Sequence, residues 1–338
     1  MTPRSPRSAL VTGASGFIGG HVAERLLAEG VRVRALVRDP TRGAWLARQG
    51  AELCAGAITD PAVVDAAVRD VDTVFHLAAV VGPAALPLAS FEAINAGGTR
   101  LVMDACRRCR SIERVVHVSS VAVTGGAPPG AAVTEDTPAS PVTRYGITKW
   151  RAEQAAGDAA RAELPVAIVR PAWVYGARSP GAIKLFQRIA TRRMVLVGRA
   201  RNTMQPVSVE DVVDALWLAA TVPGIEGRTY QVAGPEPITS GDFCGEVARA
   251  LGVPPPSLRV PMPAAMAAAR LCEWLYPLRL GKPPIDRGKL GFFVNDQHHS
   301  TERAARDLGW RARIGVGEGI RRAVRDMRAL GLVPPRIE

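Results

Sequence analysis

Short apolar runs alternate with stretches of helical periodicity along the first half of the chain. The apolar runs are typical of buried strands. They begin at Ala9, Val31, Glu52, Asp70, Arg114 and Val166. Between them, apolar residues recur at helical spacing, as at Val22, Leu26 and Leu27. Strands that alternate with helices form parallel sheets covered on both faces. We therefore expect an α/β fold built on a doubly wound parallel sheet.

The second half of the chain has a different pattern from about residue 177 onward. Proline and glycine punctuate shorter elements, for example at Pro180-Gly181 and Pro254-Pro-Pro256. Such punctuation is typical of turns between short elements. It predicts a smaller, mixed region built over the ends of the sheet, with a boundary between residues 1–176 and residues 177–338.

One later stretch, residues 264–280, is apolar but is interrupted by Arg270, Glu273 and Arg279. The chain has no run of 18 or more apolar residues, so we expect no transmembrane segment. We expect the stretch to pack as an ordinary helix; lining a pocket or resting on a membrane surface are the alternatives. The short basic N-terminus has no apolar signal segment, which predicts a cytoplasmic protein.

Composition narrows the classes of partner. The net charge is +12, but only four of the 43 basic residues are lysines, and the arginines are spread along the chain. Because they do not cluster with aromatic residues, this charge favours anionic cofactors over nucleic acid. The five cysteines are scattered, and Cys106-Arg-Arg-Cys109 has no second ligand pair nearby. We therefore expect reduced thiols and no metal site.

Three glycines, Gly13, Gly16 and Gly19, stand between the first predicted strand and the first predicted helix. The first allows a sharp turn, the second lets a pyrophosphate approach the backbone, and the third lets helix and strand pack closely. The helix N-terminus behind them offers unpaired N–H groups to phosphates. This predicts a dinucleotide site of the Rossmann type, with contacts from Gly13, Ser15, Gly16, Phe17, Ile18 and Gly19.

The end of the second predicted strand bears on which dinucleotide binds. The strand ends at Val37, and Arg38 follows it. An arginine here pairs with the 2′-phosphate of NADP, whereas an acidic residue accepts from the 2′-OH of NAD. Arg38 therefore favours NADP(H), while the adjacent Asp39 keeps NAD(H) open. After the fourth strand, Leu77, Ala78 and Ala79 are expected to let the cofactor lie close to the backbone.

Four motifs together resemble the extended short-chain dehydrogenase/reductase family, also called the NAD-dependent epimerase/dehydratase family. They are Thr12–Gly19, Val118-Ser-Ser120, Tyr145-xxx-Lys149 and Arg170–Gly176. Segments Val207–Val213 and Arg303–Trp310 extend the resemblance over nearly the whole chain. It implies a dinucleotide-binding domain in residues 1–176 that also carries the catalytic Tyr and Lys. Residues 177–338 would then mainly bind the substrate.

The resemblance implies roles that the chemistry of these residues supports. The spacing of Tyr145 and Lys149 places both on one helix face. Tyr145 would be the general acid in carbonyl reduction or the base in alcohol oxidation. Lys149 and a positive nicotinamide would lower its pKa from about 10. Ser120 would hydrogen-bond the substrate oxygen, a position that fits better than Ser119, and Asn95 would support Lys149.

Departures from the family pattern bear on the cofactor and the substrate. Ala57 replaces a common acidic residue near the adenine, which leaves Ile58 as the expected contact there. Further cofactor contacts implied by the family are Lys149, Pro171 and Val174. Trp173 and Met204 stand where sugar-nucleotide enzymes often carry Asn and Arg, so we expect both in an apolar substrate pocket.

These departures resemble the 3β-hydroxysteroid dehydrogenase and dihydroflavonol reductase branch. They predict an NADP(H)-dependent oxidoreductase acting on a secondary alcohol or ketone of a bulky apolar small molecule, such as a sterol, terpenoid or polyphenol. A nucleotide-sugar epimerase with tightly bound NAD is the main alternative. A non-catalytic dinucleotide sensor is the second alternative, although such proteins tend to lose the Tyr and Lys. The resemblance also allows a homodimer.

Overall fold

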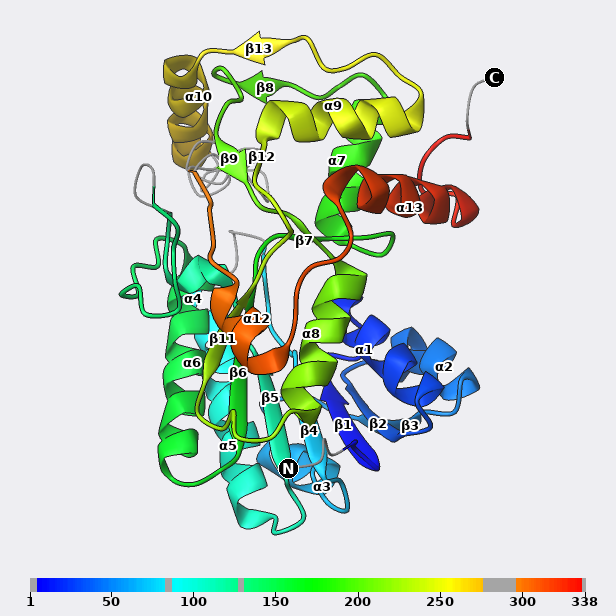
Figure 1. Ribbon diagram of the computed structural model, residues 1–338, viewed down its shortest axis with the longest axis vertical. Helices are drawn as coiled ribbons and strands as arrows, with labels where there is room; N and C mark the ends of the chain where they lie inside the picture. The colour runs from blue at the N-terminus through cyan, green and yellow to red at the C-terminus, as the bar shows by residue number, and fades with distance from the viewer. Residues whose placement is uncertain (1–4, 83–86, 127–130, 276–295, 336–338) are drawn as a thin grey trace.

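A computed structural model describes residues 5–82, 87–126, 131–275 and 296–335. Its centre is a seven-stranded sheet in which every pair of neighbouring strands runs parallel (Figure 1). This confirms the expected doubly wound sheet. In spatial order the strands are β11 (Thr229–Val232), β6 (Val166–Pro171), β5 (Arg114–Val118), β4 (Thr73–His76), β1 (Ser8–Thr12), β2 (Arg32–Val37) and β3 (Glu52–Ala55).

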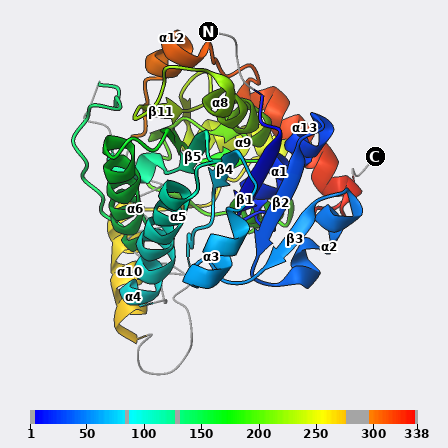
Figure 2. The same cartoon turned by 90° about the horizontal axis from the view of Figure 1, so that it is seen from below.

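Side chains along the central strands alternate between two hydrophobic layers, because successive residues of a strand point to opposite faces. In β1, Ala9 and Val11 enter one layer and Leu10 enters the other, and all three are fully buried. Helices cover both faces of the sheet (Figure 2). One face packs against α1 (Phe17–Ala28), α2 (Pro40–Arg48) and α8 (Val209–Thr221), and the other against α3 (Pro61–Ala67), α5 (Gly98–Arg108) and α6 (Arg144–Arg161).

Polar side chains at helix N-termini fix where two important helices begin. Asp39 caps α2, because its Oδ1 accepts a hydrogen bond from Thr41 N at 3.0 Å. Thr143 caps α6, because its Oγ1 accepts from Gly146 N at 2.9 Å. Such a cap stabilises a helix by about 1 kcal/mol. Tyr145 therefore lies in the first turn of α6 for a reason that is local in sequence.

Two helices precede β5 in the chain after β4. Helix α4 (Leu88–Phe91) is the first. A π-helical turn, η1 (Glu92–Gly97), joins α4 to α5. Such turns are rare and are frequent at functional sites. Asn95 is buried within this turn.

The C-terminal half contains the smaller mixed region that the sequence predicts. Helices α7 (Pro180–Ala190), α9 (Ser240–Leu251) and α13 (Val316–Ala329) share a separate hydrophobic core. Strands of two residues pair around these helices. The pairs are β7 (Val174–Tyr175) with β10 (Val207–Ser208), β9 (Thr203–Met204) with β12 (Ile238–Thr239), and β8 (Leu196–Val197) with β13 (Arg259–Val260).

The two halves of the chain interleave. Strand β11 belongs to the C-terminal half, yet it forms one edge of the main sheet beside β6. Helix α8 likewise covers the main sheet. Helix α12 (Glu302–Leu308) lies near β11, and Trp310, which follows it, donates from Nε1 to Asp211 O at 3.0 Å. We therefore propose that residue 176 divides the chain by function, with cofactor binding before it and mainly substrate binding after it.

Part of the stretch 264–280 forms helix α10 (Met262–Leu275), and residues 276–280 lie outside the described residues. Ala265 and Ala269 are buried and pack against Val197 and Val260. Leu271 is exposed on the same helix. Among the described residues, none of the helices has both the length and the apolar character needed to cross a bilayer.

Candidate active site

The glycine loop between β1 and α1 is tightly closed against the rest of the fold. Gly13 has φ +71°, a conformation that L side chains rarely adopt, and a Cβ there would lie 2.9 Å from Ala78 N. A Cβ on Gly19 would lie 2.8 Å from the Gly13 carbonyl carbon and closer still to its oxygen. The N-cap of α1 is Gly16, which supplies no side-chain hydrogen bond. The first N–H groups of α1 therefore suit a phosphate, and the loop fits a dinucleotide.

Thr12 joins the glycine loop to the loop after β4, a role that the sequence analysis missed. Its Oγ1 accepts hydrogen bonds from Leu77 N and Ala78 N, both at 3.2 Å. The same oxygen lies 2.7 Å from His76 Nδ1. Burial lowers the pKa of His76 to about 3, so the ring is neutral and serves as a hydrogen-bonding spacer. The buried Thr12 fixes the separation of the two loops.

Asn95 acts on the backbone near the site. Its Oδ1 accepts from Val80 N at 2.7 Å, and its Nδ2 donates to Val80 O at 3.1 Å. Nδ2 also donates to Thr148 Oγ1 at 2.9 Å. Asn95 therefore ties the loop after β4 to helix α6 one residue before Lys149, while its neighbour Ile94 lines the cavity.

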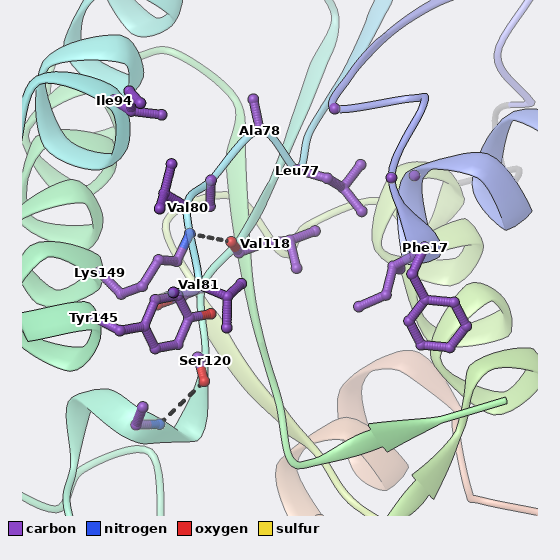
Figure 3. Close-up of a pocket in the computed structure, with 18 of the residues that line it drawn as sticks. Phe17, Leu77, Ala78, Val80, Val81, Ile94, Val118, Ser120, Tyr145 and Lys149 are labelled. Atoms are coloured by element: carbon purple, nitrogen blue, oxygen red, sulfur yellow. Dashed lines mark hydrogen bonds between the residues drawn. The ribbon is translucent and has the colours of Figure 1, made fainter. Parts of the chain in front are cut away.

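Lys149 and Tyr145 lie on one face of α6, with Ser120 opposite them (Figure 3). Lys149 is buried, and its Nζ donates to Val118 O at 2.6 Å. Burial lowers the pKa of Lys149 to about 8, and the Glu153 carboxylate opposes that shift. Lys149 is therefore still charged at neutral pH and is fixed to the end of β5.

The phenol of Tyr145 is subject to two opposing effects. Burial raises its pKa above the ordinary value, and a hydrogen bond with Ser120 lowers it. The larger effect is burial, so the net pKa is raised. The family resemblance predicts that Lys149, together with a bound nicotinamide, lowers this pKa. In this structure the ammonium is directed to the Val118 carbonyl, and the phenol is protonated at neutral pH.

Ser120 and Ser119 follow β5 and both border the cavity. Ser120 begins the short 3-10 turn η2 (Val121–Val123), where its Oγ accepts from Ala122 N at 3.2 Å. Its hydroxyl also interacts with Tyr145. Ser119 is buried, and its Oγ has no hydrogen-bond partner among the described residues. The contact with Tyr145 distinguishes Ser120 from its neighbour.

A cavity of about 1720 Å³ brings most of the sequence-predicted residues together. It extends from the glycine loop, past the ends of β4, β5 and β6, to the start of α7. Its lining contains Gly13, Ser15, Gly16, Phe17, Ile18, Gly19, Arg38, Ile58, Leu77, Ala78, Ala79, Ser120, Tyr145, Lys149, Pro171, Trp173 and Val174. Binding pockets commonly measure about 300–1,000 Å³, so this cavity can take a cofactor and a substrate together.

Met204 lies apart from this lining. It is 5 % exposed and packs in the C-terminal core. Trp173 does line the cavity and stacks on Tyr175, with ring centroids 6.2 Å apart. Phe243 meets Trp173 edge-on at 5.5 Å. The two residues that the sequence analysis grouped together thus lie in different environments, because Met204 belongs to a short strand turned toward the core.

Two arginines line the cavity after β2, although the sequence analysis selected only Arg38. Arg42 is the second, in the first turn of α2. The carboxylate between them in sequence, Asp39, accepts hydrogen bonds from the backbone and side chain of Thr41. Those bonds lower the pKa of Asp39, which is therefore ionised and engaged as a helix cap. The spacing Arg38-xxx-Arg42 at a strand–helix junction was the signal available in the sequence.

Comparison with known proteins gives the same assignment as the geometry. The profile of the NAD dependent epimerase/dehydratase family matches residues 9–233. A 2-alkyl-3-oxoalkanoate reductase of Stenotrophomonas maltophilia is 32% identical over 327 residues, which cover 93% of this chain and 97% of that protein.

A 4-hydroxy-2-methyl-3-oxo-4-farnesyl-3,4-dihydroquinoline-1-oxide ketoreductase of Stigmatella aurantiaca is 29% identical over 315 residues, covering 92% of this chain and 93% of the relative. The solved structure of MoeE5 with UDP-glucose and NAD is 26% identical, with a TM-score of 0.77 and coverage of 96% of this chain and 99% of that one. The chain belongs to the NAD-dependent epimerase/dehydratase family, the extended short-chain dehydrogenases/reductases.

Proposed function

We propose that this protein is an NADP(H)-dependent oxidoreductase that reduces a ketone on a bulky, largely apolar small molecule. The observation that carries the proposal is the placement of a protonated Tyr145 against Ser120 at an apolar cavity, with charged Lys149 anchored beside it. Tyr145 can donate a proton to a substrate oxygen, and the Ser120 hydroxyl can orient that oxygen by a hydrogen bond. Both are what a carbonyl needs as it accepts a hydride.

The cofactor, when bound, supplies the hydride. Tyr145 donates its phenolic proton to the oxygen that receives negative charge. Ser120 hydrogen-bonds the same oxygen and holds it in line with that proton. Lys149, held by Val118 O, keeps a positive charge near the phenolate that remains. The raised pKa of Tyr145 keeps the phenol in its acid form at neutral pH, which is the form that donates a proton in reduction.

The walls of the cavity support an apolar substrate. Beside the Ser120 and Tyr145 pair, the lining is rich in hydrocarbon, including Val80, Phe91, Ile94, Val142 and Trp173. Val142 is 77% exposed at the protein surface, so apolar surface continues to the outside. The two relatives described above carry names that specify ketone reduction on farnesylated or alkylated molecules. A long or branched hydrocarbon fits this lining.

Arg38 and Arg42 support NADP(H) over NAD(H). Both line the cavity at the end of β2, and the nearby carboxylate of Asp39 is occupied as the cap of α2. A charge-assisted hydrogen bond contributes about 1.5–3 kcal/mol, which is a 10- to 150-fold preference. Titration calorimetry should therefore give tighter binding of NADPH than NADH. The double substitution Arg38→Ala and Arg42→Ala should make the two affinities similar.

Replacing Tyr145 by Phe tests the proposed chemistry. The variant should bind NADPH like the wild type, because the aromatic ring remains and only the hydroxyl is lost. Ketone reduction should fall by about 10²–10⁴-fold with the loss of the proton donor. Circular dichroism checks the fold of the variant. Near-normal turnover in folded, NADPH-binding Tyr145→Phe protein contradicts the assignment of Tyr145.

A nucleotide-sugar epimerase is the second candidate, because the solved structure of a relative at 26% identity holds UDP-glucose and NAD. Trp173 in the lining and the burial of Met204 speak against a diphosphate-binding sugar site. Purified protein that retains NAD and binds UDP-glucose in calorimetry would favour the epimerase.

A further inference from the structure

Helix α10 and the strands β8 and β13 form the end of the molecule opposite the N-terminus (Figure 1). Strand β8 pairs with β13, and Ala265 and Ala269 of α10 pack against Val197 and Val260 of these strands. The three elements therefore form one small layer. Its outer surface, named here the α10 face, consists of the exposed side chains of residues 199, 258–259 and 263–271.

Helix α10 is apolar on its outward side as well as on its buried side. A helix on a protein surface normally presents polar residues to water opposite its buried stripe. In α10 the outward positions Ala264, Ala267, Ala268 and Leu271 follow the i, i+3, i+4, i+7 spacing of one helix face, and all four are exposed. Leu271 is 55% exposed. This second apolar stripe indicates a contact beyond the strands that α10 already covers.

Leu258 extends the exposed apolar surface from the helix to the neighbouring strand. It precedes β13 directly and is 62% exposed. Its carbonyl oxygen accepts from Leu196 N at 2.9 Å, which fixes its backbone to β8. The α10 face thus has two large aliphatic side chains, Leu258 and Leu271, on a rigid support of paired strands and packed helix.

The charges around these aliphatic side chains are positive. The two stretches that build the layer, residues 188–202 and 253–271, contain seven arginines and neither aspartate nor glutamate. On the α10 face itself the cations are Arg199, Arg259 and Arg270, all exposed. Arg259 Nη1 donates to Arg199 O at 2.7 Å. Within the described part of the chain, none of these three guanidiniums pairs with a carboxylate, so all three can meet an external anion.

We propose that the α10 face binds the surface of a bilayer that contains anionic lipids. An apolar stripe flanked by cations is the pattern of a helix that lies in the boundary between head groups and acyl chains. Leu258, Leu271 and the outward alanines enter that boundary, and the arginines bind lipid phosphates. This contact is separate from the proposed chemistry, because the cavity lining that the structure describes includes no residue of the α10 face.

Nucleic acid is the other large polyanion that a basic surface attracts, and the α10 face suits it less well. Single strands stack their bases on aromatic side chains, and duplexes are read by polar contacts to base edges. The described exposed side chains of the α10 face are aliphatic or arginine, with no aromatic ring among them. Exposed leucines contribute to binding at a bilayer and contribute little at a phosphate backbone.

The test measures flotation of the full-length protein with lipid vesicles. One set is phosphatidylcholine alone, and the other is phosphatidylcholine with phosphatidylglycerol. The wild type should bind the anionic vesicles and not the neutral ones, and added salt should weaken binding. Each cation near an anionic surface raises binding about 5-fold, so Arg199→Gln combined with Arg270→Gln should lower it about 25-fold.

Arg107→Gln combined with Arg110→Gln is the matched control, because it changes the net charge of the protein by the same amount. Both arginines are exposed, and they lie in and just after the last turn of α5, at the other end of the molecule (Figure 1). This variant should bind anionic vesicles like the wild type. Circular dichroism checks the fold of every variant.

Leu271→Ser separates a bilayer from other polyanions. It should lower binding to anionic vesicles about 5-fold or more, because a buried leucine side chain contributes at least that much. Binding of a DNA duplex should not change. The proposal is overturned if the wild type does not bind anionic vesicles at low salt, or if the control variant loses as much binding as the Arg199 and Arg270 variant. Tighter binding of the duplex than of the vesicles, with no effect of Leu271→Ser on either, assigns the surface to nucleic acid and likewise overturns it.

Discussion

Gly319 in α13 tests how tightly the C-terminal core is packed against Tyr175. A Cβ at this position would lie 2.8 Å from Tyr175 Cζ and closer still to the Tyr175 hydroxyl. Tyr175 is 1% exposed and is confined by Trp173 and Phe243, whose ring centroids lie 6.2 and 6.0 Å away. Replacing Gly319 by Ala therefore forces α13 and the Tyr175 ring apart.

The magnitude follows from two opposing effects. Carbon atoms in contact prefer a separation of about 3.5 Å, so the pair must separate by at least about 0.7 Å in a core where the ring has no free space. Overpacking of this kind costs about 1–3 kcal/mol. Alanine recovers up to about 1 kcal/mol of helix propensity over glycine. We expect Gly319→Ala to lower the free energy of unfolding by up to about 2 kcal/mol and Tm by up to roughly 4 °C.

Gly317 is a control two residues earlier in the same helix. A Cβ there would meet only Arg321 Nη1 at 3.5 Å and Glu246 Oε2 at 3.7 Å, which are ordinary contacts. Gly317→Ala should leave Tm unchanged or raise it. Denaturant unfolding and thermal melting by circular dichroism measure both variants. Equal stability of Gly319→Ala and Gly317→Ala would refute the argument that Tyr175 fills the space above Gly319.

Three further results follow from groups on α6. For ketone reduction, kcat/KM should stay level at neutral pH and fall above about pH 8. Lys149 loses its charge in that range while Tyr145 keeps its proton. A kcat/KM that rises through pH 8 contradicts this expectation. Glu153→Gln should lower the free energy of unfolding by about 3–5 kcal/mol, since it leaves the buried Arg170 guanidinium without its charged partner; denaturant unfolding measures the loss. Thr143→Ala should cost about 1 kcal/mol by removing the cap of α6, whereas Thr143→Ser should cost little.

The sequence predicted the elements whose pattern is local and strongly periodic. The strands through residue 171 and the glycine loop lie where they were expected, because apolar runs and the turn at Gly13 depend on few distant contacts. The Tyr145–Lys149 pair follows from helix periodicity in the same way. Their roles in catalysis remain predictions.

Other features depend on contacts that one sequence does not reveal. Thr12 Oγ1 bonds to the loop after β4, some 65 residues later, so nothing local marks it. The two-residue strand of Met204 has too few positions for its periodicity to show which way the side chain points. Strand β11 has only four residues, and its place at the sheet edge depends on pairing with β6.

Strand β11 is synthesised long after β6, the strand with which it pairs. Thr229 pairs with Ile168, and Gln231 N donates to Glu135 Oε1 across 96 residues of sequence. Until residue 232 leaves the ribosome, β6 is an uncovered edge with open backbone groups, and such edges template aggregation. A nascent chain stalled between residues 176 and 228 therefore holds the complete Tyr145 and Lys149 helix but an unfinished sheet. A chaperone that covers the open edge of β6 would act during this interval.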